Sequence, residues 1–60
     1  MSTVYNPEAD IMARIERLEL DAKEMRRKVE HTHNENDKRV LNRQLKEIRE
    51  EITILQAKLP

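Results

Sequence analysis

The sequence predicts an all-α fold: a two-helix antiparallel coiled-coil hairpin that dimerises into a four-helix bundle. Three observations predict it. Apolar residues recur in two regular series, a polar stretch separates the two series, and the residues of the two series pair one to one when the 60-residue chain is folded about Glu35.

The first helix is expected over residues 7–30, after a flexible N-terminal lead of residues 1–6. Asn6 is a good N-cap, and Pro7 suits the first helical position because the N–H that proline lacks has no partner there. The apolar residues that follow are spaced by alternating steps of four and three: Ile11, Ile15, Leu18, Ala22, Met25 and Val29. This spacing is typical of a coiled-coil seam.

A turn is expected over residues 31–35, followed by a second helix over 36–59. Thr32 with Glu35 fits a capping box, while Asn34 or Asn36 could equally cap the second helix or close the first. The second helix carries a seam with the same alternating steps: Leu41, Leu45, Ile48, Ile52, Leu55 and Leu59.

The relation between the two seams favours a hairpin over one continuous helix. Val29 and Leu41 are 12 residues apart, two more than a continuous heptad pattern allows. Folding the chain about Glu35 instead pairs all six residues of one seam with those of the other, since the numbers in each pair sum to 70. A single rod in a parallel coiled coil is the alternative.

Charged residues flank the predicted seam on both edges. Glu19 is expected to face Arg49 favourably. On the other edge, Asp21 is expected near Glu51 and Arg14 near Lys58, which places like charges together. This mismatch suggests that the edge meets something other than its own hairpin partner.

Self-association is expected because so short a chain builds only a thin core, and it has no cysteine for a disulfide. Four apolar residues outside the seams form the candidate dimer or partner face: Met12, Leu20, Val40 and Ile54. Single exposed apolar residues are also normal on a protein surface. Residues 23–49 carry nine basic and five acidic side chains while the rest of the chain carries net −4, so two hairpins should attract each other head to tail.

The sequence gives little support for a catalytic or metal-binding role. His31 and His33 are interpreted as solvated turn residues, and no metal or cofactor is predicted. Serine occurs once, at Ser2, and the glycine-rich loops that bind phosphates are absent, so we do not expect an enzyme. No apolar stretch is long enough for a membrane span, and a cytoplasmic location is expected.

We therefore expect a small protein–protein interaction module: an adaptor, assembly factor or regulator of a larger partner, acting through its helix faces and forming a homodimer. The alternative is a nucleic-acid-associated or transcription regulator that uses the basic half of the hairpin near the turn. The candidate basic contact surface comprises Arg26, Arg27, Lys28, Lys38, Arg39, Arg43, Lys46 and Arg49.

The second half of the chain carries an acidic turn, Asn34-Glu35-Asn36-Asp37, and a closing apolar stretch of Ile52, Leu55 and Leu59. In these features it loosely resembles the coiled-coil arm of bacterial transcript-cleavage factors, which reach into the RNA polymerase secondary channel. The Gly-Asp element typical of that family's tip is absent, so the sequence predicts no membership of the family.

Overall fold

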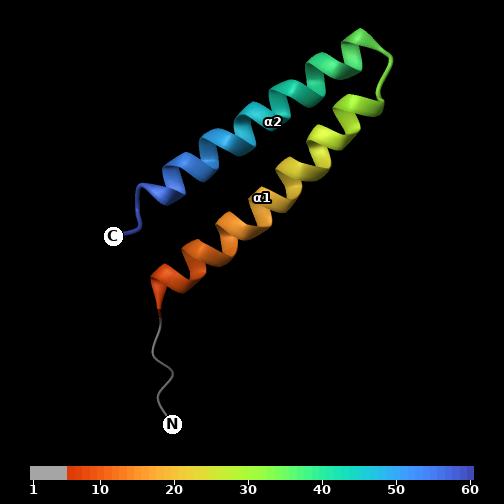
Figure 1. Ribbon diagram of the computed structural model, residues 1–60. Helices are drawn as coiled ribbons and strands as arrows, with labels where there is room; N and C mark the ends of the chain where they lie inside the picture. Colours follow the sequence, from red (N-terminus) through yellow and green to blue (C-terminus); the bar gives the residue numbers. More distant parts are fainter. Residues whose placement is uncertain (1–5) are drawn as a thin grey trace.

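The computed structural model describes residues 6–60 as two helices, α1 (Pro7–His31) and α2 (Glu35–Gln56), which pack side by side and run in opposite directions (Figure 1). This confirms the predicted two-helix hairpin and excludes the single rod. Of the predicted N-terminal lead, residues 1–5 lie outside the described part of the chain. Neither helix is long and apolar enough to cross a membrane.

Helix α1 begins where the sequence predicts. The Asn6 side chain accepts hydrogen bonds from the backbone N–H groups of Glu8 and Ala9 at 3.1 and 3.3 Å. Pro7 occupies the first helical position, and Glu8 and Asp10 place negative charge in the first turn, where it suits the helix dipole. The local sequence therefore determines this helix start.

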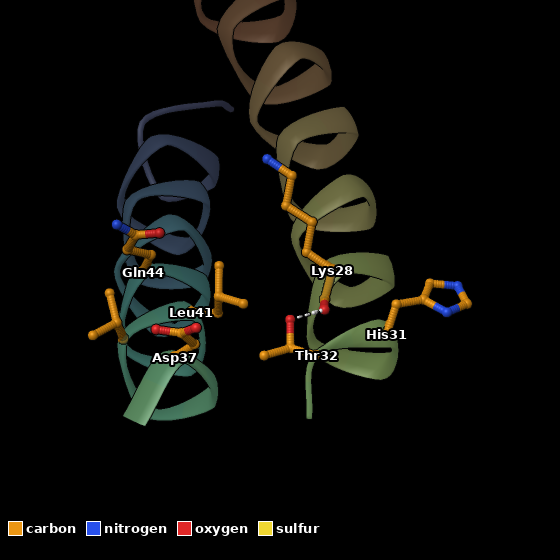
Figure 2. A pocket seen from close by; sticks show the side chains of 7 residues that line it. Lys28, His31, Thr32, Asp37, Leu41 and Gln44 are labelled. Atoms are coloured by element: carbon orange, nitrogen blue, oxygen red, sulfur yellow. Dashed lines mark hydrogen bonds between the residues drawn. The ribbon is translucent and has the colours of Figure 1, made fainter. Parts of the chain in front are cut away.

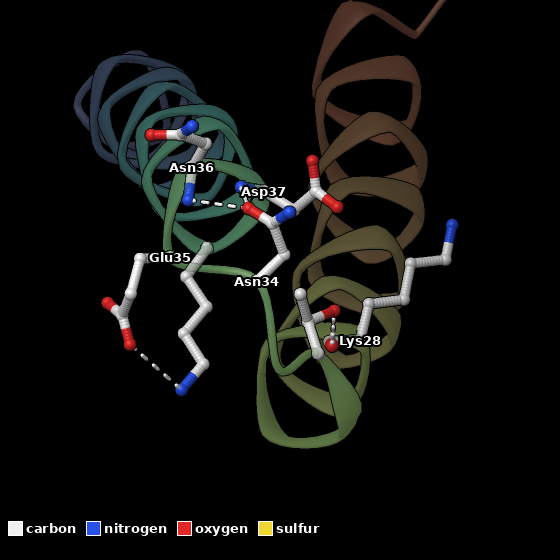
Figure 3. Close-up of polar contacts among 7 residues, drawn as sticks. Lys28, Asn34, Glu35, Asn36 and Asp37 are labelled. Atoms are coloured by element: carbon white, nitrogen blue, oxygen red, sulfur yellow. Dashed lines mark hydrogen bonds and ion pairs between the residues drawn. The ribbon is translucent and has the colours of Figure 1, made fainter.

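The turn is shorter than predicted, because it comprises residues 32–34 alone. Asn34 caps α2, and its side-chain oxygen accepts from the N–H groups of Asn36 and Asp37 at 2.8 and 3.2 Å (Figure 3). The capping-box interpretation of Thr32 is wrong. Its hydroxyl donates to the Lys28 carbonyl at 2.6 Å, so Thr32 closes α1 instead of opening α2.

Helix α2 ends at Gln56, three residues before the predicted end. The chain then continues in tight turns, in which the N–H groups of Lys58 and Leu59 donate to the carbonyls of Leu55 and Gln56 at 3.0 and 3.1 Å. Pro60 explains why Leu59 itself is not helical, because a proline disfavours helical backbone at the residue before it.

The core lies between the two helices and is thin. Four side chains are buried, Ile15, Leu18, Ala22 and Leu45, with exposed fractions of 3–7 %. The other eight seam residues are half-buried: Ile11, Met25, Val29, Leu41, Ile48, Ile52, Leu55 and Leu59. Since each helix has only the other to pack against, no side chain among the described residues is fully buried.

Candidate interaction surfaces

One ion pair between the helices identifies one side of the hairpin. The Arg14 guanidinium donates to a Glu51 carboxylate oxygen at 2.8 Å. This hydrogen bond, together with the attraction of the opposite charge, raises the pKa of Arg14 above its ordinary value. Arg14 and Glu51 therefore lie on the same side of the hairpin, which we call the groove side.

The predicted clash of like charges on this edge is wrong. Arg14 reaches Glu51 rather than standing unpaired beside Lys58, and Asp21 pairs with Arg17 one turn earlier in α1 at 3.6 Å. On the other edge, Glu19 and Arg49 form no ion pair within residues 6–60. Arg14 and Asp21 thus each pair with an opposite charge on a neighbouring helical turn, and not with the residue directly facing them.

A shallow depression lies between the helices near the turn (Figure 2). Both helices line it, with Lys28, His31, Thr32, Asp37, Val40, Leu41 and Gln44. Lys28 and Gln44 approach it from opposite helices, whereas the His31 ring points away from α2. By helical position, Lys28 and Gln44 fall on the same edges of their helices as Arg14 and Glu51, so the depression belongs to the groove side.

The histidines are not placed for metal binding in this arrangement. His31 is in the last turn of α1 and His33 is in the loop, and both are exposed. Nowhere in the described range do three histidine or acidic side chains come close enough together to hold a metal ion.

The opposite side of the hairpin gathers basic residues from both helices. Successive helical residues are about 100° apart around the helix axis. In each helix the buried seam has one edge on the groove side, marked by Arg14 in α1 and Glu51 in α2. Residues on the other edge of the seam therefore lie on the side of the hairpin opposite the groove side. Six exposed basic residues do so, and we call them the basic face: Lys23, Arg26, Arg27, Arg39, Lys46 and Arg49. None of them forms an ion pair within residues 6–60.

The structure divides the eight basic residues singled out in the sequence. Five of them belong to the basic face, among them Arg27 at the outer edge of α1, and Arg43 occupies the equivalent outer position on α2. Lys28 is on the groove side, and Lys38 is half-buried near the turn, where it pairs with Glu35 at 3.8 Å (Figure 3). The basic contact surface predicted from the sequence did not include Lys23. The helical period places Lys23 on the same edge of the α1 seam as Arg26, so this residue could have been predicted.

The four apolar residues outside the seams are exposed by 52–62 %, but they do not form one patch. Val40 lines the depression on the groove side. Ile54, 14 residues further along α2, lies toward the same side, whereas Met12 and Leu20 lie toward the basic face and the outer edge of α1. Leu20 and Ile54 border separate shallow hollows on their own helices.

The polar and charged side chains of these surfaces face solvent. No polar or charged side chain among residues 6–60 is buried. Comparisons with protein-family models, curated proteins and solved structures find no match for the chain. The proposals below therefore depend on the packing and charge of the hairpin itself.

Proposed function

We propose that this chain is a small, non-catalytic protein–protein interaction module that self-associates. Two hairpins pair into a four-helix bundle, which acts in the cytoplasm as an adaptor, assembly factor or regulator of a larger protein. The observation that carries the proposal is the incomplete burial of the hairpin's apolar residues.

The single hairpin has too small a core for its length. Among residues 6–60, only four side chains are buried, while four large apolar side chains are more than half exposed. Domains of this size usually gain the missing stability from a disulfide, a metal or self-association, and this chain has no cysteine. A second copy packed on one side of the hairpin would bury further apolar area at about 25 cal/mol per Å².

The groove side fits a second copy better than the basic face does. Val40 extends the half-buried row of α2 toward this side: Leu41, Ile48 and Leu55. Ile54 lies at the outer edge of α2, where it also borders a hollow with Lys46 and Arg49. Its flanking charges are of both signs, whereas two basic faces brought together would repel each other. Because identical surfaces meet, the contact would be two-fold symmetric and would close as a dimer.

Sedimentation equilibrium at micromolar concentration tests the proposal. We expect a species of twice the 7.2 kDa chain mass. The double variant Val40→Glu/Ile54→Glu should shift it to the monomer, because it places charge in the proposed contact. Met12→Glu/Leu20→Glu is the matched control, since it adds the same charge away from the groove side and should leave the dimer intact.

Two results would contradict this proposal. One is a 7.2 kDa species for the unmodified chain throughout the concentration range. The other is equal dissociation by the two double variants, which would mean that the groove side is not the contact.

A further inference from the structure

The basic face has no role in the proposed self-association, and its six side chains have no ionic partners within the described chain. We propose that it binds the phosphate backbone of double-stranded nucleic acid through charge, without reading base sequence. This proposal does not depend on the dimer, because a contact on the groove side would leave the basic face of each copy exposed.

The charge on this face is concentrated although the whole chain is neutral. Six basic side chains lie on the turn-proximal half of the hairpin, where the end of α1 runs beside the start of α2 (Figure 1). The acidic residues on the same side lie mostly toward its ends: Glu16 and Glu19 toward the open end, and Glu30 and Glu35 near the turn. Glu50 shares a hollow with Lys46 and Arg49 on α2. Basic side chains outnumber acidic ones between these ends, so the positive potential is local, and it would orient the molecule on a polyanion.

The length of the basic face suits a phosphate backbone. Arg39 and Arg49 are ten residues apart, which is about 15 Å along the helix axis. Phosphates of one DNA strand recur about every 3.4 Å along the duplex axis, so this length spans about four of them. Four of the six residues are arginines, whose planar guanidinium groups form paired hydrogen bonds with phosphate oxygens.

An acidic protein surface fits the same face less well. Protein partners usually insert apolar or aromatic anchors into pockets at the centre of the contact. At the centre of this face, between the basic residues of α2, lies the exposed polar residue Asn42. The exposed Leu20 borders a hollow with Lys23 and Arg26, but it lies toward the open end and not at the centre. The chain's single aromatic residue is Tyr5, so no series of rings is available to stack unpaired bases, and a duplex is favoured over a single strand.

Fluorescence anisotropy with a labelled duplex DNA of mixed sequence tests the proposal. We expect dissociation constants of about 10⁻⁴–10⁻⁶ M, as for other non-specific binding. With about four phosphates neutralised, the logarithm of the binding constant should fall with the logarithm of salt concentration with a slope near −3.6. Duplexes of different sequence should bind alike.

Two triple variants of equal charge change separate the basic face from net charge. Arg39→Gln/Lys46→Gln/Arg49→Gln removes half of the face, and we expect binding to weaken at least about tenfold and the salt slope to flatten by about half, to roughly −1.8. The control Arg17→Gln/Lys28→Gln/Lys58→Gln removes three exposed charges that lie outside the basic face and should weaken binding by less than about twofold. Circular dichroism checks that both variants keep their helices.

Three results would overturn the proposal. The first is no binding of the duplex at about 50 mM salt, where non-specific complexes are far stronger than at about 200 mM. The second is equal weakening by both triple variants, which would assign the effect to overall charge. The third is tighter binding of poly-glutamate or single-stranded DNA than of the duplex, which would favour an acidic protein or an unpaired strand as the ligand.

Discussion

Two asparagines show how single residues set the ends of these helices. Asn6 and Asn34 each accept hydrogen bonds from two backbone N–H groups of the turn that follows. Asn6 was predictable because Pro7 follows it directly. Asn34 was one of three candidate caps, and the sequence could not choose among them, because the choice depends on how Thr32 bonds back to Lys28.

Removing the cap of α2 should weaken the hairpin measurably. Asn34→Ala deletes the side-chain oxygen that accepts from Asn36 and Asp37, and such changes cost about 1 kcal/mol. Urea unfolding followed by circular dichroism measures the loss. Asn36→Ala is the control, because the Asn36 side chain caps nothing, and an equal loss in both variants would contradict the assignment of Asn34 as the cap.

The core depends on few residues, so a single truncation should have a large effect. Leu45 is the one side chain of α2 that is buried, with an exposed fraction of 7 %. Leu45→Ala should destabilise the protein by about 2–5 kcal/mol, the usual range for buried leucines. Ile48→Ala should cost less because Ile48 is only half-buried, and exposed Gln44→Ala should cost little. A small effect at Leu45 in thermal unfolding would mean that the seam is not the core.

At the scale of the helices, the spacing of apolar residues was enough to predict which face of each helix is buried. All twelve residues of the two predicted seams are buried or half-buried, because a heptad pattern specifies one face of each helix. The end of α2 was missed because Leu59 continues the apolar pattern while Pro60 disfavours helical backbone there. Periodicity reports which face is buried, but it does not report where backbone hydrogen bonding ends.

The ion pair between the helices provides a test of the antiparallel arrangement. Arg14→Glu would place a second carboxylate next to that of Glu51. The two negative charges repel each other, so the melting temperature should fall at low salt. Adding Glu51→Arg restores opposite charges in reversed order, and the double variant should recover most of the loss. Thermal melts at low and at about 1 M salt measure this, since salt screens exposed charges. A double variant less stable than Arg14→Glu alone would contradict the pairing.

For the whole molecule, the surfaces available for binding are defined by how charge is distributed around the hairpin, more than by how it is distributed along the chain. Counting along the sequence gave a positive turn half and a negative open end. Folding places six of the twelve basic residues on one side, because α1 and α2 contribute them from matching edges of the seam. The heptad positions had already placed Arg14 and Glu51 on one edge, but a count of charge along the chain does not use that information. A neutral chain thereby acquires two unlike surfaces.

The same thin core leads to a prediction about the stability of the assembly. If folding is completed only when two copies meet, mass action makes the melting temperature depend on protein concentration. A hundredfold increase adds about 2.7 kcal/mol to the stability of a dimer. With an unfolding entropy of about 2.1 cal/mol/K per residue over two chains, the melting temperature should rise by about 10 °C.

Circular dichroism melts at two concentrations a hundredfold apart measure this shift. Val40→Glu/Ile54→Glu should melt at a lower temperature that is independent of concentration, because the variant keeps the buried residues between α1 and α2 but loses the contact on the groove side. Met12→Glu/Leu20→Glu should keep the concentration dependence of the unmodified chain. The unmodified chain could instead melt at the same temperature at both concentrations. The residues buried between α1 and α2 would then be enough to hold a single hairpin together. In that case the exposed apolar side chains would need a partner other than a second copy.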